Sequence, residues 1–293
     1  MSGIDTFAIV GGDKRQVAMA ESILSDGYNV CAVGFENADL KSGITTASLK
    51  DAVKMSDYII LPVPATTSDS YLNAPHSRTQ IAVDDEFAKT MFDKKIFCAR
   101  AEDLITASPI FSNMQLYDYS KREEFAVNNA IPTAEGAIQI AMQEYAGTIN
   151  GSRCLVTGFG RIGKVLSKML KGIGAKVTAS ARKPKDIAWI NLLGYSAVLT
   201  ASLASTNAGS VDFDIIFNTI PSLIFNPDVL ERLPKNAVII DLASLPGGVD
   251  FNAARKLKIK AIQALALPGK VAPRAAGEII KNTIYNMIEE GQL

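Results

Sequence analysis

The sequence has little histidine, cysteine or tryptophan: 1, 3 and 1 residues respectively among 293. Its only histidine, His76, lies in a polar stretch, and no cysteine or histidine is spaced as metal ligands are. The sequence therefore predicts no metal site. The three cysteines, Cys31, Cys98 and Cys154, lie far apart in or beside apolar runs, which indicates small buried hydrophobic residues in a reducing compartment.

An excess of charge is also missing, because 30 Lys and Arg balance 30 Asp and Glu. This balance indicates neither a nucleic acid nor an anionic membrane as partner. No apolar run approaches the roughly 18 residues of a membrane span. The first residues do not form a signal peptide, since Asp5 interrupts them. We expect a cytoplasmic protein that acts on a small molecule, and we leave open whether it forms a homo-oligomer.

The sequence is rich in apolar residues, at 48%, and it is long enough for two domains. In the first part, apolar strand-like runs alternate with helical spacing such as that of residues 14–24. This alternation predicts a parallel sheet with crossover helices. The predicted strands are Thr6–Val10, Tyr28–Phe35, Tyr58–Val63 and Lys94–Ala99. Residues 66–84 are polar and predict a long loop.

The central motif is Gly158-Phe159-Gly160-Arg161-Ile162-Gly163, which follows the predicted strand 154–157 and opens the predicted helix 162–170. This order is typical of a dinucleotide-binding turn. The first glycine permits the turn, the second lets the backbone approach a pyrophosphate, and the third lets the helix approach the strand. The alternative is a glycine-rich turn without a ligand.

Five further strands follow the motif, so that the second part reads as a complete Rossmann unit. They are predicted at Lys176–Ser180, Ala197–Leu199, Asp214–Asn218, Ala237–Asp241 and Lys260–Ala264. We therefore expect an α/β protein with two doubly wound Rossmann-like domains and an interdomain cleft. The predicted parts are an N-terminal domain (1–130), a connecting helix (131–150), the dinucleotide domain (151–273) and a C-terminal helix (274–293) that returns to the first domain.

The end of the second Rossmann strand predicts the cofactor. An NAD site usually has an acidic residue there to hold the ribose 2′-hydroxyl. This sequence has Ser180, Arg182 and Lys183 instead, a hydroxyl and two cations that suit a 2′-phosphate. We therefore predict NADP rather than NAD. The alternative is an ordinary solvated basic turn.

Later strand ends carry small polar residues, and in α/β sheets ligands bind at the carboxyl ends of strands. Residues expected near the nicotinamide are Asn218, Thr219, Pro221 and Ser244. The cations nearest to such a rim in the sequence are Arg15, Lys270 and Arg274, the candidates to hold a substrate carboxylate.

Two residues have open interpretations as acids or bases. His76 is a surface loop residue or a catalytic base, and we favour the loop residue. Glu135 follows Pro132, so it is either a capping charge in the first turn of the predicted connecting helix or an acid in the cleft. We lean towards capping.

Several blocks of the sequence form a specific combination. They are Val10-Gly11-Gly12-Asp13-Lys14-Arg15-Gln16, Ile60-Leu61-Pro62-Val63, Ile131-Pro132-Thr133-Ala134-Glu135-Gly136, the glycine motif, Asn218-Thr219-Ile220-Pro221-Ser222, Asp241-Leu242-Ala243-Ser244, Pro246-Gly247-Gly248 and Leu267-Pro268-Gly269-Lys270-Val271-Ala272-Pro273. Together these blocks resemble the A subunits of dipicolinate synthase, over nearly the whole length. One departure from that family is Leu245, where a basic residue is expected.

The resemblance implies oxidation of the dihydrodipicolinate synthase product to dipicolinate during spore formation, together with a flavoprotein-like B subunit. Becoming aromatic supplies much of the driving force, so that the protein must chiefly orient the ring and hold two carboxylates. If the substrate arrives hydroxylated, loss of water needs an acid. Glu135, Ser244 and Thr66 are candidates for this proton transfer.

Two alternatives remain. A 2-hydroxyacid or methylenetetrahydrofolate dehydrogenase shares the two-domain plan, but hydroxyacid dehydrogenases of this plan usually use a late histidine, and none follows His76. The other alternative is a regulatory subunit that binds NADP without turning it over.

Overall fold

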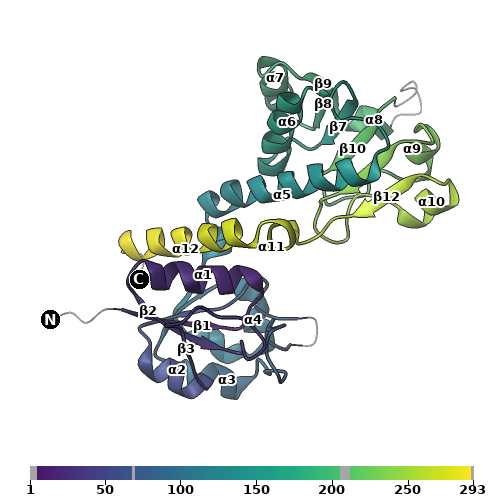
Figure 1. Cartoon of the computed structure of the whole chain (residues 1–293). Helices are drawn as coiled ribbons and strands as arrows, with labels where there is room; N and C mark the ends of the chain where they lie inside the picture. Colours follow the sequence, from purple (N-terminus) through teal and green to yellow (C-terminus); the bar gives the residue numbers. More distant parts are fainter. Residues whose placement is uncertain (1–4, 68–69, 205–211, 292–293) are drawn as a thin grey trace. The chain divides into compact units, whose positions relative to one another are not determined.

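The computed structural model describes residues 5–67, 70–204 and 212–291. The chain forms two compact units, unit 1 from residues 1–128 and 272–293 and unit 2 from residues 129–271. Each unit contains one six-stranded sheet flanked by helices (Figure 1). The predicted α/β class with two Rossmann-like sheets is thereby confirmed.

The sheet of unit 1 has the strand order β3-β2-β1-β4-β5-β6, and all of its pairs are parallel. This is the 3-2-1-4-5-6 order of dinucleotide-binding folds. Along β1, Ala8 and Val10 join one buried cluster while Phe7 and Ile9 join another, as a strand with two covered faces requires. The strands are β1 (Thr6–Val10), β2 (Asn29–Val33), β3 (Thr45–Thr46), β4 (Tyr58–Ile60), β5 (Lys95–Cys98) and β6 (Leu116–Asp118).

Five α-helices accompany this sheet among the described residues: α1 (Lys14–Ser25), α2 (Leu49–Met55), α3 (Asp85–Thr90), α4 (Ala101–Ala107) and α12 (Pro273–Glu289). Two short 3₁₀ helices, η1 (Pro109–Asn113) and η2 (Tyr119–Lys121), precede and follow β6. The segment predicted as a loop, residues 66–84, has only isolated bridges over its described residues, Thr66 with Leu72 and Tyr71 with Ala82.

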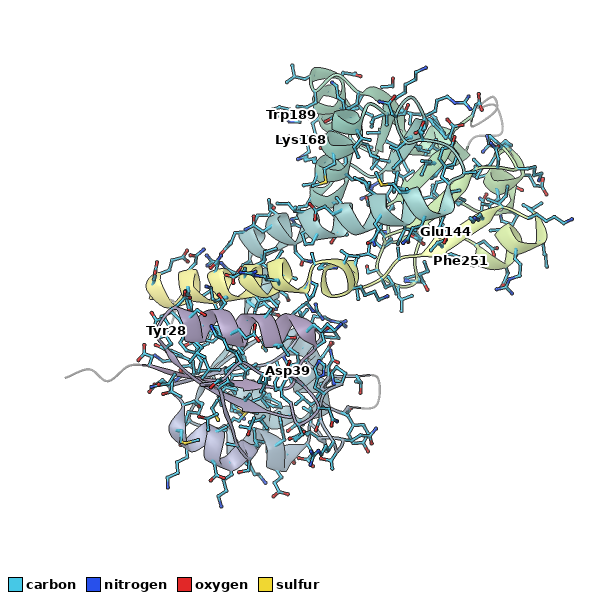
Figure 2. The ribbon with its side chains drawn as sticks, in the orientation of Figure 1. Tyr28, Asp39, Glu144, Lys168, Trp189 and Phe251 are labelled. Carbon is cyan, nitrogen blue, oxygen red and sulfur yellow. The ribbon has the colours of Figure 1, made fainter. Side chains whose placement is uncertain are left out.

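The C-terminal helix α12 packs against α1. The two helices approach closely, since a Cβ on Gly277 would lie 2.5 Å from the Arg15 carbonyl oxygen. Lys281, which is buried, donates to Ser22 of α1 and to Asp26, the C-cap residue of α1, at 2.7 Å in each case. The ring of Tyr285 makes an edge-to-face contact with the ring of Tyr28, and Tyr28 follows α1 (Figure 2). The last helix therefore completes the core of the first unit.

The sheet of unit 2 is again parallel and has the order β12-β11-β10-β7-β8-β9, which is the same 3-2-1-4-5-6 arrangement. Its strands are β7 (Arg153–Thr157), β8 (Lys176–Ala181), β9 (Ser196–Leu199), β10 (Ile215–Asn218), β11 (Val238–Asp241) and β12 (Lys260–Gln263). Its helices are α6 (Arg161–Ile173), α7 (Pro184–Leu192), α8 (Thr200–Ala204), α9 (Pro227–Glu231), α10 (Phe251–Lys256) and α11 (Leu267–Val271).

Helix α5 runs from Glu123 to Glu144, whereas the sequence predicted its start at residue 131. Pro132 lies inside the helix, although proline removes a backbone donor there. Glu135 is consequently a mid-helix residue, and the prediction that it caps a first turn is wrong. At the far end of α5, the Lys260 ammonium donates to the carbonyl and the carboxylate of Glu144, and these bonds tie α5 to β12.

Over the described residues, no helix is both long and apolar enough to cross a membrane.

Candidate functional site

Two positions of the glycine motif, the first and the third glycine, leave no room for a side chain. Gly158 has φ +90°, and a Cβ there would lie 2.5 Å from Thr219 Oγ1. A Cβ on Gly163 would lie 2.1 Å from the Gly158 carbonyl oxygen, because α6 approaches the end of β7 so closely. These two glycines therefore have the roles that the motif predicts for its first and third positions.

Gly160, the second glycine, faces open space. It is the N-cap of α6, and a Cβ built on it would meet nothing within 4 Å. No side chain of the described residues caps the helix through a hydrogen bond at this position. The start of α6 thus offers backbone donors, the positive end of the helix dipole and room for a ligand. That combination fits the pyrophosphate of a dinucleotide.

A cavity of about 670 Å³ lies beside this turn, within the range of small-molecule sites. It brings together parts of the glycine motif, the basic turn after β8 and the end of β10. Its lining residues are Gly158, Phe159, Gly160, Arg161, Ala181, Arg182, Lys183, Lys185, Asp186, Thr200, Thr219, Ile220 and Pro221. Ile162 and Gly163 lie behind the turn, where Ile162 contacts the core.

Ser180 does not line this cavity. Its side chain is fully buried, and its hydroxyl lies 3.2 Å from the hydroxyl of Thr200 and 3.4 Å from the backbone nitrogen of Gly158. The prediction that Ser180 donates to a 2′-phosphate is therefore not supported, because side chains alternate along β8 and this one points inward. Ser180 braces the glycine turn instead.

Asn218 also serves the scaffold. It is fully buried and donates to the Asp241 carboxylate at 2.7 Å, while its amide oxygen accepts from the Thr157 hydroxyl at 2.6 Å. Asp241 in turn accepts from the backbone N–H of Gly248 at 2.9 Å. This buried network joins the ends of β7, β10 and β11, so Asn218 shapes the rim and does not face the cofactor cavity.

Arg182 and Lys183 are exposed side chains that line the cavity, as predicted. Arg161 and Lys185 are further cations of the lining, and Asp186 in the first turn of α7 is its one acid. Sequence reasoning missed Lys185, Asp186 and Thr200. Thr200 follows β9 directly, so the strand-end rule applied to Asn218 could have identified it.

The candidates for proton transfer do not gather at this cavity. Ser244 is exposed in the turn after β11, where its carbonyl accepts from the N–H of Gly247 at 2.9 Å. Glu135 lines a separate apolar groove with Ile138, Met142 and other residues of α5 and α6. Thr66 belongs to unit 1 and lines a third cavity.

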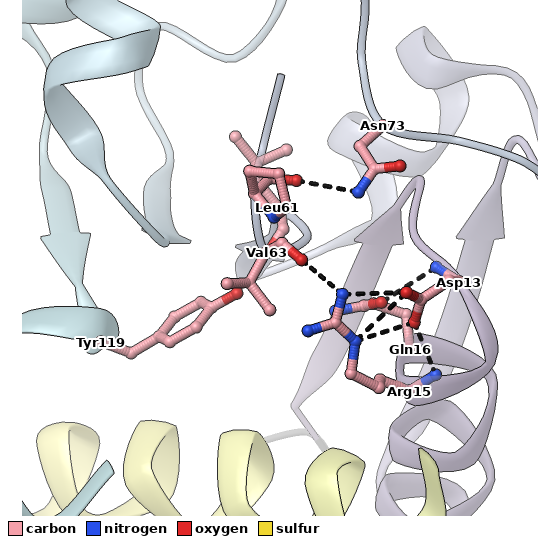
Figure 3. A network of polar contacts seen from close by, with 8 residues as sticks. Asp13, Arg15, Gln16, Leu61, Val63, Asn73 and Tyr119 are labelled. Carbon is pink, nitrogen blue, oxygen red and sulfur yellow. Dashed lines mark hydrogen bonds and ion pairs between the residues drawn. The ribbon is translucent and has the colours of Figure 1, made fainter. Parts of the chain in front are cut away.

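Arg15 is buried and already paired (Figure 3). Its guanidinium binds both carboxylate oxygens of Asp13, at 2.8 to 3.2 Å, and donates to the Val63 carbonyl. Burial acts to raise the pKa of Asp13, but the side-chain and backbone hydrogen bonds from Arg15 outweigh it and the pKa is lowered. The predicted role of Arg15 as a substrate clamp is therefore not supported, since its charge is neutralised within the chain.

The other two predicted cations do not line the cofactor cavity. Arg274 lines a cavity of about 640 Å³ in unit 1, between α1 and α12, together with acidic residues such as Glu21 and Glu278. Lys270 is exposed on α11 of unit 2. His76 is half-buried, with its ring 6.2 Å from that of Phe35, and its charge helps to lower the pKa of Asp13.

Comparison with known proteins bears on both units. Residues 6–120 match the N-terminal domain of the dipicolinate synthase A subunit, and residues 126–261 match the NAD binding domain of D-isomer specific 2-hydroxyacid dehydrogenases. The sequence is 33% identical to the dipicolinate synthase A subunit of Bacillus subtilis, over 97% of this chain and 96% of the relative.

Two solved structures resemble the fold over nearly the full length. The dipicolinate synthase A subunit from Bacillus halodurans has a TM-score of 0.86 at 29% identity, covering 98% of this chain and 99% of the other. Its counterpart from Bacillus subtilis has a TM-score of 0.85 at 32% identity, covering 100% of this chain and 98% of the other. The nicotinamide-binding domain makes the chain an oxidoreductase, and it belongs to the family of dipicolinate synthase A subunits.

Proposed function

We propose that this chain is the NADP-dependent dehydrogenase subunit of a dipicolinate synthase. It oxidises the dihydrodipicolinate-type product of dihydrodipicolinate synthase to dipicolinate for spore formation. The observation that carries the proposal is the open turn at Gly160, beside a basic cavity, in a chain that belongs to this family.

Arg182 and Lys183 support NADP as the cofactor, since both line the cavity directly after β8. Lys185 adds to the positive charge, which a 2′-phosphate requires. Asp186 is the one acid among the lining residues. Arg161 also lines the cavity, so that four cations face one acid and the lining stays positive overall, which favours the more anionic cofactor.

The residues of this chain would orient both reactants. The amides at the start of α6 would hold the pyrophosphate, and the buried Thr157–Asn218–Asp241 network fixes the strand ends that would orient the rest of the cofactor. Bound NADP⁺ supplies an acceptor for the hydride that leaves the dihydropyridine ring. A proton leaves the ring as well, and Ser244 and Thr66 remain the candidates to assist its transfer. Glu135 is less suited, since it lines an apolar groove away from the cofactor cavity.

A second, flavoprotein-like B subunit completes the activity in this proposal, and both proteins work in the cytoplasm. The family name supports this partner, since it describes one subunit of a synthase.

The decisive experiment is incubation of the protein, with and without the B subunit, with freshly generated dihydrodipicolinate synthase product and either NADP or NAD. Dipicolinate is followed by its ultraviolet absorbance. We expect product with NADP. No dipicolinate under any combination would contradict the proposal, and equal rates with NAD would contradict the cofactor assignment.

Arg182→Glu tests the 2′-phosphate contact directly. Loss of one charge-assisted pair and gain of repulsion should weaken NADP binding at least tenfold, while NAD binding changes little. Arg255→Glu, on α10 of the same unit, is the matched control and should leave both affinities unchanged. An equal loss for both cofactors would show that Arg182 does not contact the phosphate.

A further inference from the structure

Unit 1 has its own cavity at the carboxyl ends of β4 and β5. Its volume is about 320 Å³, which is enough for one small ring compound. Hydroxyl groups dominate its wall, alongside one cation and one acid. The lining residues are Pro64, Thr66, Thr67, Ser70, Arg100, Asp103, Thr106 and Ala107.

Arg100 is held in an unusual backbone conformation, with φ +58°, which residues other than glycine rarely adopt. Its N–H donates to Asp118 Oδ1 at 3.3 Å and to Ser120 Oγ at 3.2 Å, and the next N–H donates to Asp118 Oδ2 at 3.0 Å. Ser70, on the same cavity wall, also has φ +58°. Such strained residues cluster at ligand sites, where neighbours hold them in place.

The guanidinium of Arg100 can exchange its present carboxylate partner for the carboxylate of a ligand. Its partner is Asp103, at 3.0 Å, and the Arg100 side chain is 64% exposed. An exposed ion pair of this kind contributes little to stability, so that a ligand carboxylate can replace Asp103 at small cost. Arginine is suited to this role because its planar fork matches a carboxylate.

Thr66 lies on the same wall and is half-buried. Within the described part of the chain, its hydroxyl has no hydrogen-bond partner, unlike that of Thr106, which donates to the Glu102 carbonyl at 2.8 Å. A hydroxyl that is half-shielded from water and uncommitted can donate to a ligand carboxylate beside the Arg100 fork.

Two of the three cations that the sequence suggested for substrate recognition lie beside carboxylates of the chain. Arg15 is neutralised by Asp13, and Arg274 lines a cavity that also contains Glu21, Asp39 and Glu278. Arg100 is the cation of the cavity that also contains Thr66.

We propose that Arg100 and Thr66 form a carboxylate-binding subsite in unit 1, and that its ligand is the pyridine-dicarboxylate class of substrate and product. The assignment of the ligand rests on the proposed function. In this subsite the ligand carboxylate displaces Asp103 from the guanidinium and accepts a hydrogen bond from the Thr66 hydroxyl.

The test is titration of the full chain with pyridine-2,6-dicarboxylate by calorimetry, in metal-free buffer with NADP present. Arg100→Gln should raise the Kd at least tenfold, and Thr66→Val severalfold. Asp103→Asn should leave the Kd unchanged or lower it, because it removes the competing carboxylate. Lys89→Gln, an exposed cation in the last turn of α3, is the control and should have no effect.

An unchanged Kd for Arg100→Gln would overturn the subsite, provided that the variant still binds NADP as the wild type does. Equal weakening by Asp103→Asn and Arg100→Gln would also overturn it, since it would indicate a purely structural ion pair. The two proposals fail separately. If the wild type turns over and Arg100→Gln leaves the KM unchanged, only the subsite is contradicted. If the ligand binds in an Arg100-dependent way but no dipicolinate forms, only the enzymatic assignment is contradicted.

Discussion

The two units share one strand order, yet the turn after the first strand is open to a ligand in unit 2 and closed to one in unit 1. In unit 2 the turn after β7 leaves the start of α6 without a side-chain cap and with open space at Gly160. In unit 1 the turn after β1 is closed by the chain itself. The Asp13 carboxylate caps α1 by accepting from the Arg15 N–H, and Gln16 accepts from the Asp13 N–H.

Two further backbone donors of the unit 1 turn are also used. The N–H of Gly11 binds the Val33 carbonyl at 2.9 Å, and that of Gly12 binds the Asn73 carbonyl at 2.8 Å. A pyrophosphate at the start of α1 would therefore face the Asp13 carboxylate, which repels it, and not backbone N–H groups that could bind it. Strand order therefore does not determine whether a Rossmann-like unit binds a dinucleotide; the occupant of the first helix N-terminus does.

The largest expected effect comes from removing α12, which only unit 1 requires. A chain that stops at Val271 loses Ile280, Ile284 and Met287 from the core, a loss of roughly 5 kcal/mol or more. Unit 1 should then unfold while unit 2 keeps its fold and still binds the dinucleotide.

Thiol labelling measures this difference between the units. Cys31 and Cys98 lie in unit 1 and Cys154 lies in unit 2, and all three are buried and free. In the intact protein burial raises the pKa of all three thiols, that of Cys154 to about 11, so all labelling should be slow. In the shortened chain, Cys31 and Cys98 should react quickly and Cys154 slowly. Equal reactivity of all three would show that the units do not fold separately.

The next largest effect is expected for a substitution of Gly163. The turn of unit 1 has no glycine at the equivalent position. Gly163→Ala places a Cβ 2.1 Å from the Gly158 carbonyl oxygen, so the helix must move. We expect a loss of about 3 kcal/mol in unfolding free energy and loss of dinucleotide binding. Gly172→Ala in the same helix meets nothing within 4 Å and should be neutral or slightly stabilising. Denaturant unfolding of both variants provides the comparison.

Asp13→Asn weakens the closure of the unit 1 turn. It keeps a capping side chain but leaves the buried Arg15 guanidinium without a counter-charge, at a cost of about 2 kcal/mol. Because the pKa of Asp13 is lowered on folding, its contribution is complete above the unfolded pKa near 4 and is lost as the pH falls through the lower folded value.

The stability difference between wild type and Asp13→Asn should therefore shrink below pH 4, measured by urea unfolding across pH. Asp250→Asn, which changes the cap of α10 in unit 2, should cost only a few tenths of a kcal/mol at any of these pH values. A pH-independent difference at Asp13 would contradict the importance of its charge.

The smallest effect on stability is expected for Gly160→Ala. Its backbone has φ −82° and ψ −159°, which alanine adopts readily, and the new Cβ meets no atom within 4 Å. Unfolding free energy should change by less than about 1 kcal/mol. Dinucleotide affinity should nevertheless fall at least tenfold, because the methyl group occupies the space of the pyrophosphate. Unchanged affinity in a fluorescence titration would contradict the open-turn interpretation.

The sequence predicted the fold well because each long strand is a buried apolar run between helical segments. It did not predict β3 and β6, which have 2 and 3 residues and too little pattern to be recognised. The start of α5 was also misplaced, because Asn128 and Pro132 both indicate a break. The helix continues through them in the structure.

The candidate site was predicted in part. Backbone features at Gly158, Gly160 and Gly163 follow from spacing, since no side chain is involved. The direction of a side chain does not follow from spacing. Ser180 and Asn218 were therefore assigned to a ligand, although their side chains are buried in the protein. Arg100 was missed, although it follows β5 closely and the strand-end rule applied elsewhere would have identified it.

The position of α12 in the chain has a consequence for synthesis. A ribosome releases every residue of the dinucleotide unit before it releases the helix that covers Met19 and Ile23 on α1. Unit 1 is thus begun before unit 2 but can complete its core only after unit 2 has been synthesised. Until α12 has been made, the apolar face of α1 stays uncovered, and exposed apolar surface of this kind is what chaperones bind.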